Sequence, residues 1–289
     1  MAKILITGAD GQLGQCFKWI EKEFSKHILF FARQNEVDIL IPWTISKYYD
    51  TSCFDIIINC AAYTNVDLAE TELKKALQLN LDGIKNLKVF AEEKQIKLIH
   101  FSTDFVFDGT KKKPYNETDI PNPLNKYGET KLAGEMALKK AKCSNVTIRL
   151  SWLYSPFGKN FVRTIIKMSR LKDSLQVVND QWGKPTYGID LARHVLNNID
   201  HPRLFKYDIY HYAQGPKTNW YKFAASIVDL LEEKCLITPI SSSMNTTTAN
   251  RPLNAVLETK RIEECLDLQV RDWSSALAEC IKNLKNDLI

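Results

Sequence analysis

The order of apolar segments predicts an α/β protein: a Rossmann-type, doubly wound parallel sheet followed by a smaller, mostly helical C-terminal part. Two observations support this fold class. Short apolar runs alternate with segments of helical period through the first 150 residues, which is the pattern of βαβ units. A glycine-rich turn directly follows the first run, and folds of this class bind phosphate groups at that turn.

Five short runs predict the strands of the sheet. They are 3–7 (KILIT), 27–32 (HILFFA), 54–60 (FDIIINC), 97–102 (KLIHFS) and 146–150 (VTIRL). Most of their residues are apolar, as expected of strands covered on both faces. Right-handed crossovers place the carboxyl ends of parallel strands at one edge of the sheet, where ligands bind. We therefore expect the chemistry in the residues that follow each strand.

Segments of helical period fill the gaps between these strands. The first begins at Gln12, and its apolar face repeats at Leu13, Phe17, Ile20 and Phe24, a spacing that favours an amphipathic helix. The other predicted helices of this half are a short one over 42–49, two within 66–94 that meet near Asn80–Gly83, and one over 125–142.

After about residue 151 the alternation loosens. Helices are predicted over 158–171, 188–199, 218–234 and 272–287, separated by extended pieces such as 209–213. A polar loop covers 241–250 and leads into Arg251-Pro252. We therefore expect a dinucleotide-binding domain over 1–150 and a sugar-nucleotide substrate domain over 151–289, with interleaved boundaries.

Composition and charge exclude several classes of protein. With 45% hydrophobic and 25% charged residues, the chain has an ordinary soluble composition. The net charge of +5 is too small to indicate nucleic acid as a partner. The seven cysteines form no CxxC pair, so neither a disulfide framework nor a metal site is predicted. No signal peptide or bilayer-length apolar run is present, and we expect a cytoplasmic protein without a membrane partner.

The glycine-rich turn predicts the site of a nucleotide pyrophosphate. Glycines at 8, 11 and 14 let the backbone approach a phosphate, and the helix that follows offers free N–H groups. Three glycines alone are a weak signal, but their position at the first strand–helix junction makes it strong. The residues of the turn expected to contact the cofactor are Gly8, Asp10, Gly11, Gln12, Leu13 and Gly14.

The end of the second strand bears on the choice of cofactor. NAD-binding folds usually place an acidic residue there to bind the ribose hydroxyls, whereas this strand ends in Ala32-Arg33. Arg33 could pair with a 2′-phosphate, which favours NADPH over NADH; the alternative is an exposed loop arginine. Asp38 and Ile39 are expected to lie against the adenine.

Tyr127 and Lys131 predict the catalytic pair. They are four residues apart on a predicted helix, so both side chains lie on one face. A phenol has a pKa near 10, and a nearby ammonium stabilises its phenolate. The pair can then act as a general acid for a ketone that becomes an alcohol. By itself this spacing also occurs on ordinary exposed helices.

Ser102 and Thr103 end the fourth strand at the edge where ligands bind. A hydroxyl there can donate to a carbonyl oxygen as charge develops on it. Because neighbouring residues of a strand point to opposite faces, only one of the two is expected to face the substrate.

With the turn and both clusters in place, the sequence resembles the extended short-chain dehydrogenase/reductases, and within them the dTDP-4-dehydrorhamnose reductases. The resemblance covers nearly the whole chain. It rests on TGADGQLG at 7–14, NCAAYTNVDLAE at 59–70, FSTDFVFDG at 101–109, NPLNKYGETKLAGE at 122–135, RLSWLYSPFGKNFVRT at 149–164, NDQWGKPT at 179–186 and NRPLNAVLETKRI at 250–262.

The resemblance implies roles for particular residues. It implies a catalytic set of Thr103, Tyr127 and Lys131. The residues it places along the dinucleotide are Ala61, Ala62, Tyr63, Asn80 and Ser102, with Tyr127 and Lys131. The residues it places around the sugar nucleotide are Thr103, Asp104, Val106, Tyr127, Trp152, Asn160, Trp182, Pro185 and Arg251. Core packing is the alternative role for both tryptophans.

Two positions depart from the family pattern. Some relatives carry acidic residues for a metal at a dimer interface, and the first of these positions is Cys16 here, so no metal is predicted. Phe105 stands where tyrosine is common, which removes one hydroxyl and leaves Thr103 untouched.

The resemblance implies reduction of the C4 keto group of dTDP-4-dehydro-6-deoxy-L-mannose by NADPH or NADH, with dTDP-L-rhamnose as the product and a monomer or weak homodimer as the working form. One alternative is a reductase of another nucleotide-linked 4-keto-6-deoxysugar. A second is a non-catalytic NADP-binding subunit similar to the regulatory subunit of methionine adenosyltransferase. The intact Thr103, Tyr127 and Lys131 set argues against the second alternative.

Overall fold

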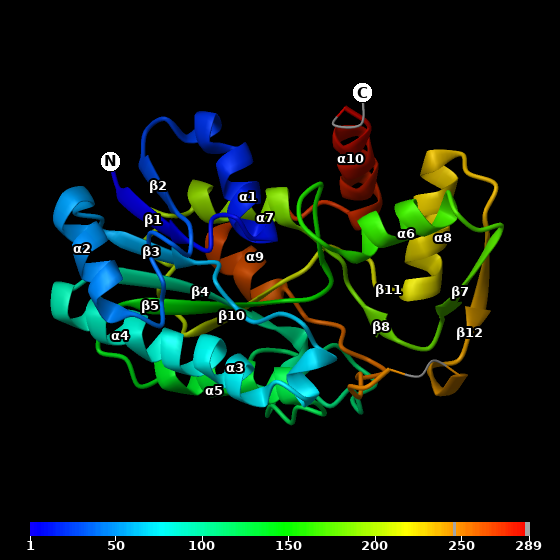
Figure 1. Ribbon diagram of the computed structural model, residues 1–289, viewed down its shortest axis with the longest axis horizontal. Coiled ribbons are helices and arrows are strands. Elements are labelled where there is room, and N and C mark those ends of the chain that lie inside the picture. Colours follow the sequence, from blue (N-terminus) through cyan, green and yellow to red (C-terminus); the bar gives the residue numbers. More distant parts are fainter. Residues whose placement is uncertain (245–246, 287–289) are drawn as a thin grey trace.

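The structure, a computed structural model, describes residues 1–244 and 247–286. Its centre is a six-stranded sheet in which all neighbouring strands are parallel, in the order β10-β5-β4-β3-β1-β2 (Figure 1). The strands are β1 (Lys3–Thr7), β2 (Ile28–Ala32), β3 (Ile56–Asn59), β4 (Lys97–Thr103), β5 (Asn145–Leu150) and β10 (Ile209–Tyr212). The predicted Rossmann-type fold is confirmed.

The order of the strands fixes where a ligand can bind. From β1 the chain moves outward to β2 and then returns to the other side of β1 as β3. Crossovers on the two sides of β1 therefore leave in opposite directions, which opens a crevice between the carboxyl ends of β1 and β3. The glycine turn follows β1 and Cys60 follows β3, so both lie at this crevice.

Helices cover both faces of the sheet (Figure 1). On one face lie α1 (Gln12–Trp19) and α7 (Gly188–Asn197), and on the other lie α2 (Pro42–Ser52), α4 (Gly83–Lys94) and α5 (Lys126–Leu138). Alternation along each strand feeds two cores: Ile4 and Ile6 of β1 join one, while Leu5 joins the other. Burial of apolar side chains on both faces explains the nearly continuous apolar runs of the sequence.

The helical segments of the first half are close to prediction. The first helix ends at Trp19 and continues as a 3₁₀ turn, η1 (Glu21–Phe24), instead of running to Phe24 as one α-helix. Between α3 (Leu73–Leu77) and α4, a π-helical turn, η3 (Gln78–Asp82), marks the predicted junction near residue 80. This turn aims Asn80 into the protein, where it is 1% exposed.

The C-terminal half forms a second lobe, built around α6 (Phe161–Ser169) and α8 (Trp220–Leu231). A parallel pair that the sequence did not predict lies beside them, β7 (Ser174–Val178) with β12 (Leu236–Ile240). The other small elements are β6 (Leu153–Tyr154) with β9 (Thr186–Tyr187), β8 (Trp182–Gly183) with β11 (Thr218–Asn219), η5 (Ser242–Met244), α9 (Lys260–Leu266) and α10 (Trp273–Asn286). Residues 245–246 of the polar loop and 287–289 lie outside the described residues.

The chain passes back to the large sheet after the second lobe has begun. Strand β10 pairs with β5, with Ile209 opposite Thr147. The division into domains at residue 150 stays a prediction, and the return of β10 agrees with interleaved boundaries.

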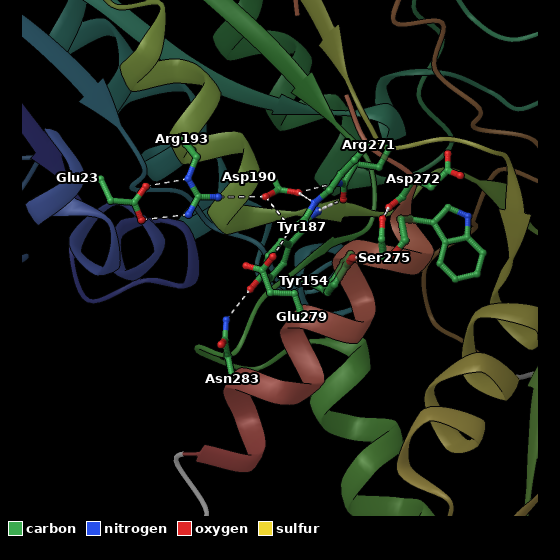
Figure 2. Close-up of polar contacts among 12 residues, drawn as sticks. Glu23, Tyr154, Tyr187, Asp190, Arg193, Arg271, Asp272, Ser275, Glu279 and Asn283 are labelled. Atoms are coloured by element: carbon green, nitrogen blue, oxygen red, sulfur yellow. Dashed lines mark hydrogen bonds and ion pairs between the residues drawn. The ribbon is translucent and has the colours of Figure 1, made fainter. Parts of the chain in front are cut away.

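A network of ion pairs links α10 to the helices above the sheet (Figure 2). Asp190 in the first turn of α7 accepts from Arg271 Nε at 2.7 Å and from its Nη2 at 2.9 Å. Arg271 also reaches Glu279 of α10 at 2.7 Å, and Arg193 joins Asp190 to Glu23. Within residues 1–244 and 247–286, no helix combines the length and apolar character needed to cross a bilayer.

Candidate active site

The glycine turn forms a cradle that side chains would fill. Gly8 has a φ of +62°, and a Cβ built on it would lie 2.7 Å from Ala61 N. A Cβ on Gly14 would lie 2.5 Å from the Gly8 carbonyl oxygen. Only glycine lets the backbone after β1, the backbone after β3 and the start of α1 come this close. The first N–H groups of α1 are consequently open to an anion.

A cavity of about 290 Å³ runs from this turn toward the end of β2. Its lining includes Asp10, Asp38, Ile39, Ala61 and Ala62, which matches the residues expected around the adenosine. Arg33 is not in this lining; its exposed guanidinium lies 3.4 Å from Asp10 at the mouth of the turn.

A second cavity, of about 410 Å³, lies at the carboxyl edge of the sheet. It brings together the predicted residues Gly11, Gln12, Leu13, Ala62, Ser102, Thr103, Asp104, Tyr127, Lys131, Trp152 and Asn160. These residues come from α1, β4, α5 and the start of the second lobe, so the fold assembles one site from segments 150 residues apart.

Tyr127 is held in the first turn of α5. The helix begins here because the Asn125 side chain caps it, accepting from Gly128 N at 2.8 Å. A Cβ on Gly128 would lie 2.2 Å from the Phe105 carbonyl oxygen, so glycine lets the helix approach the end of β4. Desolvation raises the pKa of the Tyr127 phenol to about 12, and the Thr103 hydroxyl lowers it by a smaller amount. The phenol therefore carries its proton at neutral pH.

Lys131 is 2% exposed, one turn further along α5. Its ammonium donates to the Phe101 carbonyl oxygen at 2.7 Å and lies 3.5 Å from His100 Nε2. Desolvation lowers the pKa of this amine to about 8. The residues expected to form the catalytic pair thus line one cavity. The expected lowering of the Tyr127 pKa by the ammonium is not found, because desolvation of the phenol outweighs the groups that favour its phenolate.

Both Ser102 and Thr103 line the cavity, and the expectation that only one of them faces the substrate stays a prediction. Strand β4 ends at Thr103, and the chain turns at once into the 3₁₀ helix η4 (Asp104–Val106). Thr103 Oγ1 donates to Asp104 Oδ1 at 3.1 Å and accepts from Phe105 N at 3.2 Å.

Three buried polar atoms around this cavity have no hydrogen-bond partner among the described residues: Ser102 Oγ, Asp104 Oδ2 and Gln12 Nε2. Burial raises the pKa of the Asp104 carboxyl to about 7. Unpaired buried polar atoms are costly and uncommon, and their gathering around one cavity marks it as a place built for a polar ligand.

A third cavity, of about 320 Å³, adjoins the second in the C-terminal lobe, and we call it the aromatic cavity after the five aromatic side chains in its lining. Trp152, which has a φ of +49°, stacks on Trp220 with ring centroids 3.6 Å apart. Trp182 and Arg251 also line this cavity. The Arg251 guanidinium forms a two-pronged pair with Asp67, at 2.7 and 3.2 Å, and so ties the end of the polar loop to the segment after β3.

Some expected residues lie outside the cavities. Asn80 is bonded to Tyr63 N at 2.9 Å, to Tyr63 O at 3.0 Å and to Thr130 Oγ1 at 3.0 Å, so it supports the loop from behind. Val106 is fully buried in a small apolar cluster with Phe107, because η4 turns its side chain inward. Pro185 is also outside the linings of the three cavities. Its carbonyl oxygen accepts from Gln214 N at 2.9 Å.

Sequence reasoning missed several residues of the site. Asn59 and Cys60 line the second cavity, and both stand at the end of a predicted strand, where the rule of strand ends would have found them. Trp220 lines two of the cavities, but it lies at a helix start in the second lobe and no local pattern indicates its role. Within the described residues, no group of three or more histidine, cysteine or acidic side chains is arranged to hold a metal ion.

Comparisons with known proteins point in one direction. The chain matches the family described as RmlD substrate binding domain over residues 2–286. It is 36% identical to the dTDP-4-dehydrorhamnose reductase of Aggregatibacter actinomycetemcomitans, over 96% of this chain and 97% of that protein. The solved structure of such a reductase from Clostridium acetobutylicum superposes with a TM-score of 0.92 at 35% identity, covering 98% of this chain and 99% of that one.

A second solved structure bears on the cofactor. It is the dTDP-4-dehydrorhamnose reductase of Bacillus anthracis in complex with NADP, and it is similar to this chain with a TM-score of 0.91 and 32% identity. The similarity covers 98% of this chain and 99% of that one.

Proposed function

The chain belongs to the RmlD substrate binding domain family, and on that premise we propose that it is an NADPH-dependent oxidoreductase that reduces dTDP-4-dehydro-6-deoxy-L-mannose at C4 to dTDP-L-rhamnose. The observation that carries the proposal is the single cavity lined by the glycine turn, Thr103, Tyr127 and Lys131. A phosphate cradle, a hydroxyl donor and a buried acid are the groups that hydride reduction of a ketone requires.

The residues around the crevice fit a dinucleotide. The Gly8–Gly14 turn is of the kind that binds a pyrophosphate, and a Cβ on Gly8 or Gly14 would collide with backbone. Asp38, Ile39, Ala61 and Ala62 line the cavity that would take the adenosine. When bound, NADPH supplies the hydride. Arg33, at the mouth of the same turn, is the residue that would meet a 2′-phosphate.

Tyr127 acts as the general acid. Its phenol holds the proton at neutral pH because desolvation raises its pKa, and it gives that proton to the substrate oxygen as the carbonyl becomes an alcohol. The Thr103 hydroxyl stands beside it and orients the same oxygen. The phenolate that results is stabilised by Thr103 and by the charge of Lys131 one helical turn away.

The aromatic cavity suits the nucleotide part of the substrate. Trp152 and Trp182 offer flat faces for a pyrimidine ring, and the cavity opens beside the catalytic one through the shared residues Phe105, Trp152 and Trp220. Arg251 lines it and would meet a diphosphate or the edge of the base. The sugar then lies between the two cavities, next to Thr103 and Tyr127.

A turnover assay tests the proposal. Purified protein is incubated with NADPH and dTDP-4-dehydrorhamnose, and both NADPH oxidation and the sugar nucleotide formed are measured. The proposal predicts one dTDP-L-rhamnose for each NADPH consumed. Turnover only with another nucleotide-linked 4-keto sugar would assign a different substrate to the same chemistry. NADP binding without turnover of any such sugar would instead indicate a non-catalytic binding subunit.

A further inference from the structure

A row of polar side chains crosses the sheet beneath the catalytic cavity. Thr7 of β1 is opposite Asn59 of β3, and Asn59 is opposite His100 of β4. Two residues earlier on the same strands, the equivalent row is Leu5, Ile57 and Leu98, which is wholly apolar and belongs to the core under α4 and α5. In the polar row, hydrogen-bonding side chains therefore take the place of apolar core residues. This row lies next to Lys131.

All members of this row are buried: Thr7 is 0% exposed, Asn59 2% and His100 1%. Polar groups this deep are stable only when they are hydrogen-bonded. Thr7 Oγ1 donates to Asn59 Oδ1 at 2.7 Å, Asn59 Nδ2 lies 3.2 Å from His100 Nδ1, and His100 Nε2 lies 3.5 Å from Lys131 Nζ. The chain of contacts thus ends at a catalytic residue.

The backbone fixes the direction of these contacts. Ala61 N–H, which can only donate, meets Asn59 Oδ1 at 3.2 Å. That places the Asn59 Nδ2 group, also a donor, against His100 Nδ1, which must then accept. A neutral imidazole that accepts at Nδ1 carries its proton on Nε2. The N–H of His100 consequently faces Lys131 Nζ at 3.5 Å, and one N–H of the lysine donates to the Phe101 carbonyl oxygen at 2.7 Å.

We propose that His100 is a positioning residue for Lys131: held by Asn59 with its proton on Nε2, it turns an N–H toward the lysine nitrogen and so favours release of a proton from Lys131 during turnover. This inference rests on the proposed reductase function. An N–H that faces an ammonium repels it, whereas the same N–H donates to a neutral amine. Burial, which lowers the pKa of Lys131 to about 8, acts in the same direction.

The other titratable groups near Lys131 do not reverse this effect. They are Cys60 after β3, Asp104 at the end of β4, and Tyr127 and Glu135 of α5. Glu135 raises the pKa of Lys131, but both of its oxygens are held by Arg149 of β5, at 2.9 and 2.7 Å. Asp104 is buried, and its pKa is raised to about 7. Among the titratable side chains of the described residues named here, His100 is the one in hydrogen-bond range of the amine.

Release of this proton completes the proton balance of the reaction. Tyr127 loses its proton to the substrate oxygen and becomes a phenolate. A proton given up by the Lys131 ammonium restores the phenol and leaves a neutral amine, which regains a proton from solvent water. The rate should therefore fall as pH rises through the pKa of Lys131, because the ammonium is the form that supplies the proton.

Two measurements test the proposal. The first is the ¹⁵N spectrum of the histidine side chains in the protein without substrate, with the His100 signals assigned by their loss in His100→Gln. The expected result is a neutral ring with its proton on Nε2. A proton on Nδ1 overturns the proposal. Because this measurement needs no turnover, it decides the tautomer even if the enzyme reduces a different sugar and the proposed function fails.

The second measurement is the basic limb of the pH profile of kcat. In Asn59→Asp, a carboxylate oxygen faces His100 Nδ1 and draws the proton there, which leaves Nε2 as an acceptor for Lys131. The basic limb of the kcat profile should therefore shift to higher pH by about one unit. In His100→Gln the amide can accept from Asn59 and present N–H to Lys131, so the limb should stay in place.

Thr147→Val is the matched control. Thr147 is the neighbour of His100 on β5 and is equally buried, so this variant changes the same row without touching the contacts to Lys131 and should keep the wild-type limb. A limb that stays in place in Asn59→Asp, or that moves in His100→Gln, overturns the proposal. If Asn59→Asp does not fold, the ¹⁵N spectrum of the wild type remains the deciding result.

Discussion

Two buried aspartates of this protein differ in how completely their carboxylate oxygens are hydrogen-bonded. Asp190 accepts four hydrogen bonds, from Arg271, Arg193 and Gln214, so both of its oxygens are saturated (Figure 2). Asp104 accepts from Thr103 through Oδ1, while its Oδ2 has no partner among the described residues. The first carboxylate belongs to a closed network that joins α7 to α10, and the second belongs to a buried residue in the lining of the second cavity.

The difference shows how buried polar groups that hold the fold together can be told from those that are available to a ligand. A buried network that satisfies every member fixes the elements it joins, because breaking any contact leaves a charge unpaired. A site that must bind a ligand cannot satisfy all of its polar atoms in advance, since some must be free to meet the ligand. Ser102 and Gln12 follow Asp104 in this respect.

The largest effect is expected at the catalytic cavity. Tyr127→Phe removes the proton donor and one hydroxyl while keeping the ring, so kcat should fall by about a hundredfold or more. Thermal unfolding and the dissociation constant for NADP should stay close to wild type, because the phenol is not part of a closed network. Steady-state kinetics and a binding titration provide the check. A variant with near-normal kcat would remove Tyr127 from the role of acid.

The opposite pattern is expected at the closed network. Asp190→Ala leaves Arg271 and Arg193 without their shared partner, and the free energy of unfolding should drop by about 2 kcal/mol. Fully buried pairs lose roughly 3–5 kcal/mol on such truncation. The loss is smaller here because the two arginine side chains are 36% and 33% exposed and water can solvate them. Urea denaturation measures the loss, and kcat of the folded variant should be nearly unchanged.

A matched control for this variant is Glu264→Ala. Its partner Lys260 and Glu264 are 72% and 68% exposed in their side chains, so this ion pair should add little to stability. Equal losses in Asp190→Ala and Glu264→Ala would show that the network around Asp190 has no special structural role.

Arg251 could have either a structural or a ligand-binding role, since it both lines the aromatic cavity and pairs with Asp67. If it binds the substrate, Arg251→Ala should weaken dTDP-rhamnose binding by about 1.5–3 kcal/mol in the presence of NADP and leave NADP binding unchanged. If it only tethers the loop, the effect should be at most about 1 kcal/mol. Asp67→Ala breaks the tether and also the bond that Asp67 Oδ1 accepts from Ala249 N at 3.1 Å, but it leaves the guanidinium in place. Calorimetric titration of both variants tells the two roles apart.

The last expected effect, the smallest when counted per pH unit near the ends of its range, is a pH dependence of stability due to Asp104. Burial raises the pKa of its carboxyl from 3.8 to about 7 in the folded protein. Between these values the folded state holds one proton more than the unfolded state, so the free energy of unfolding falls as pH rises, by up to about 1.4 kcal/mol per pH unit. The contribution is complete below the lower value and lost above the upper one.

Asp104→Asn, which is neutral throughout, should lack this slope. The test compares the free energies of unfolding of the wild type and of this variant between the two pKa values. A difference that does not change with pH would mean that Asp104 stays charged, like a member of the closed network.

The sequence predicted the sheet because apolar runs encode strands covered on both faces, and the rule of strand ends placed Ser102 and Thr103 at the edge where ligands bind. The grouping of Thr103 with Tyr127 and Lys131 came from the resemblance to the reductase family, and all three line one cavity. The closed network could not be predicted, because Glu23, Asp190 and Arg271 are brought together only by packing of distant elements. The β7–β12 pair was missed for the same reason: its strands are more than 50 residues apart.

The most direct test of the account is a crystal structure of the protein with NADP and dTDP-L-rhamnose. We expect Ser102 Oγ, Asp104 Oδ2 and Gln12 Nε2 each to lie within about 3.2 Å of a polar atom of a ligand, or of a water held by one, while the contacts of Asp190 stay as they are. A sugar nucleotide bound elsewhere, with these three atoms still unpaired, would contradict it.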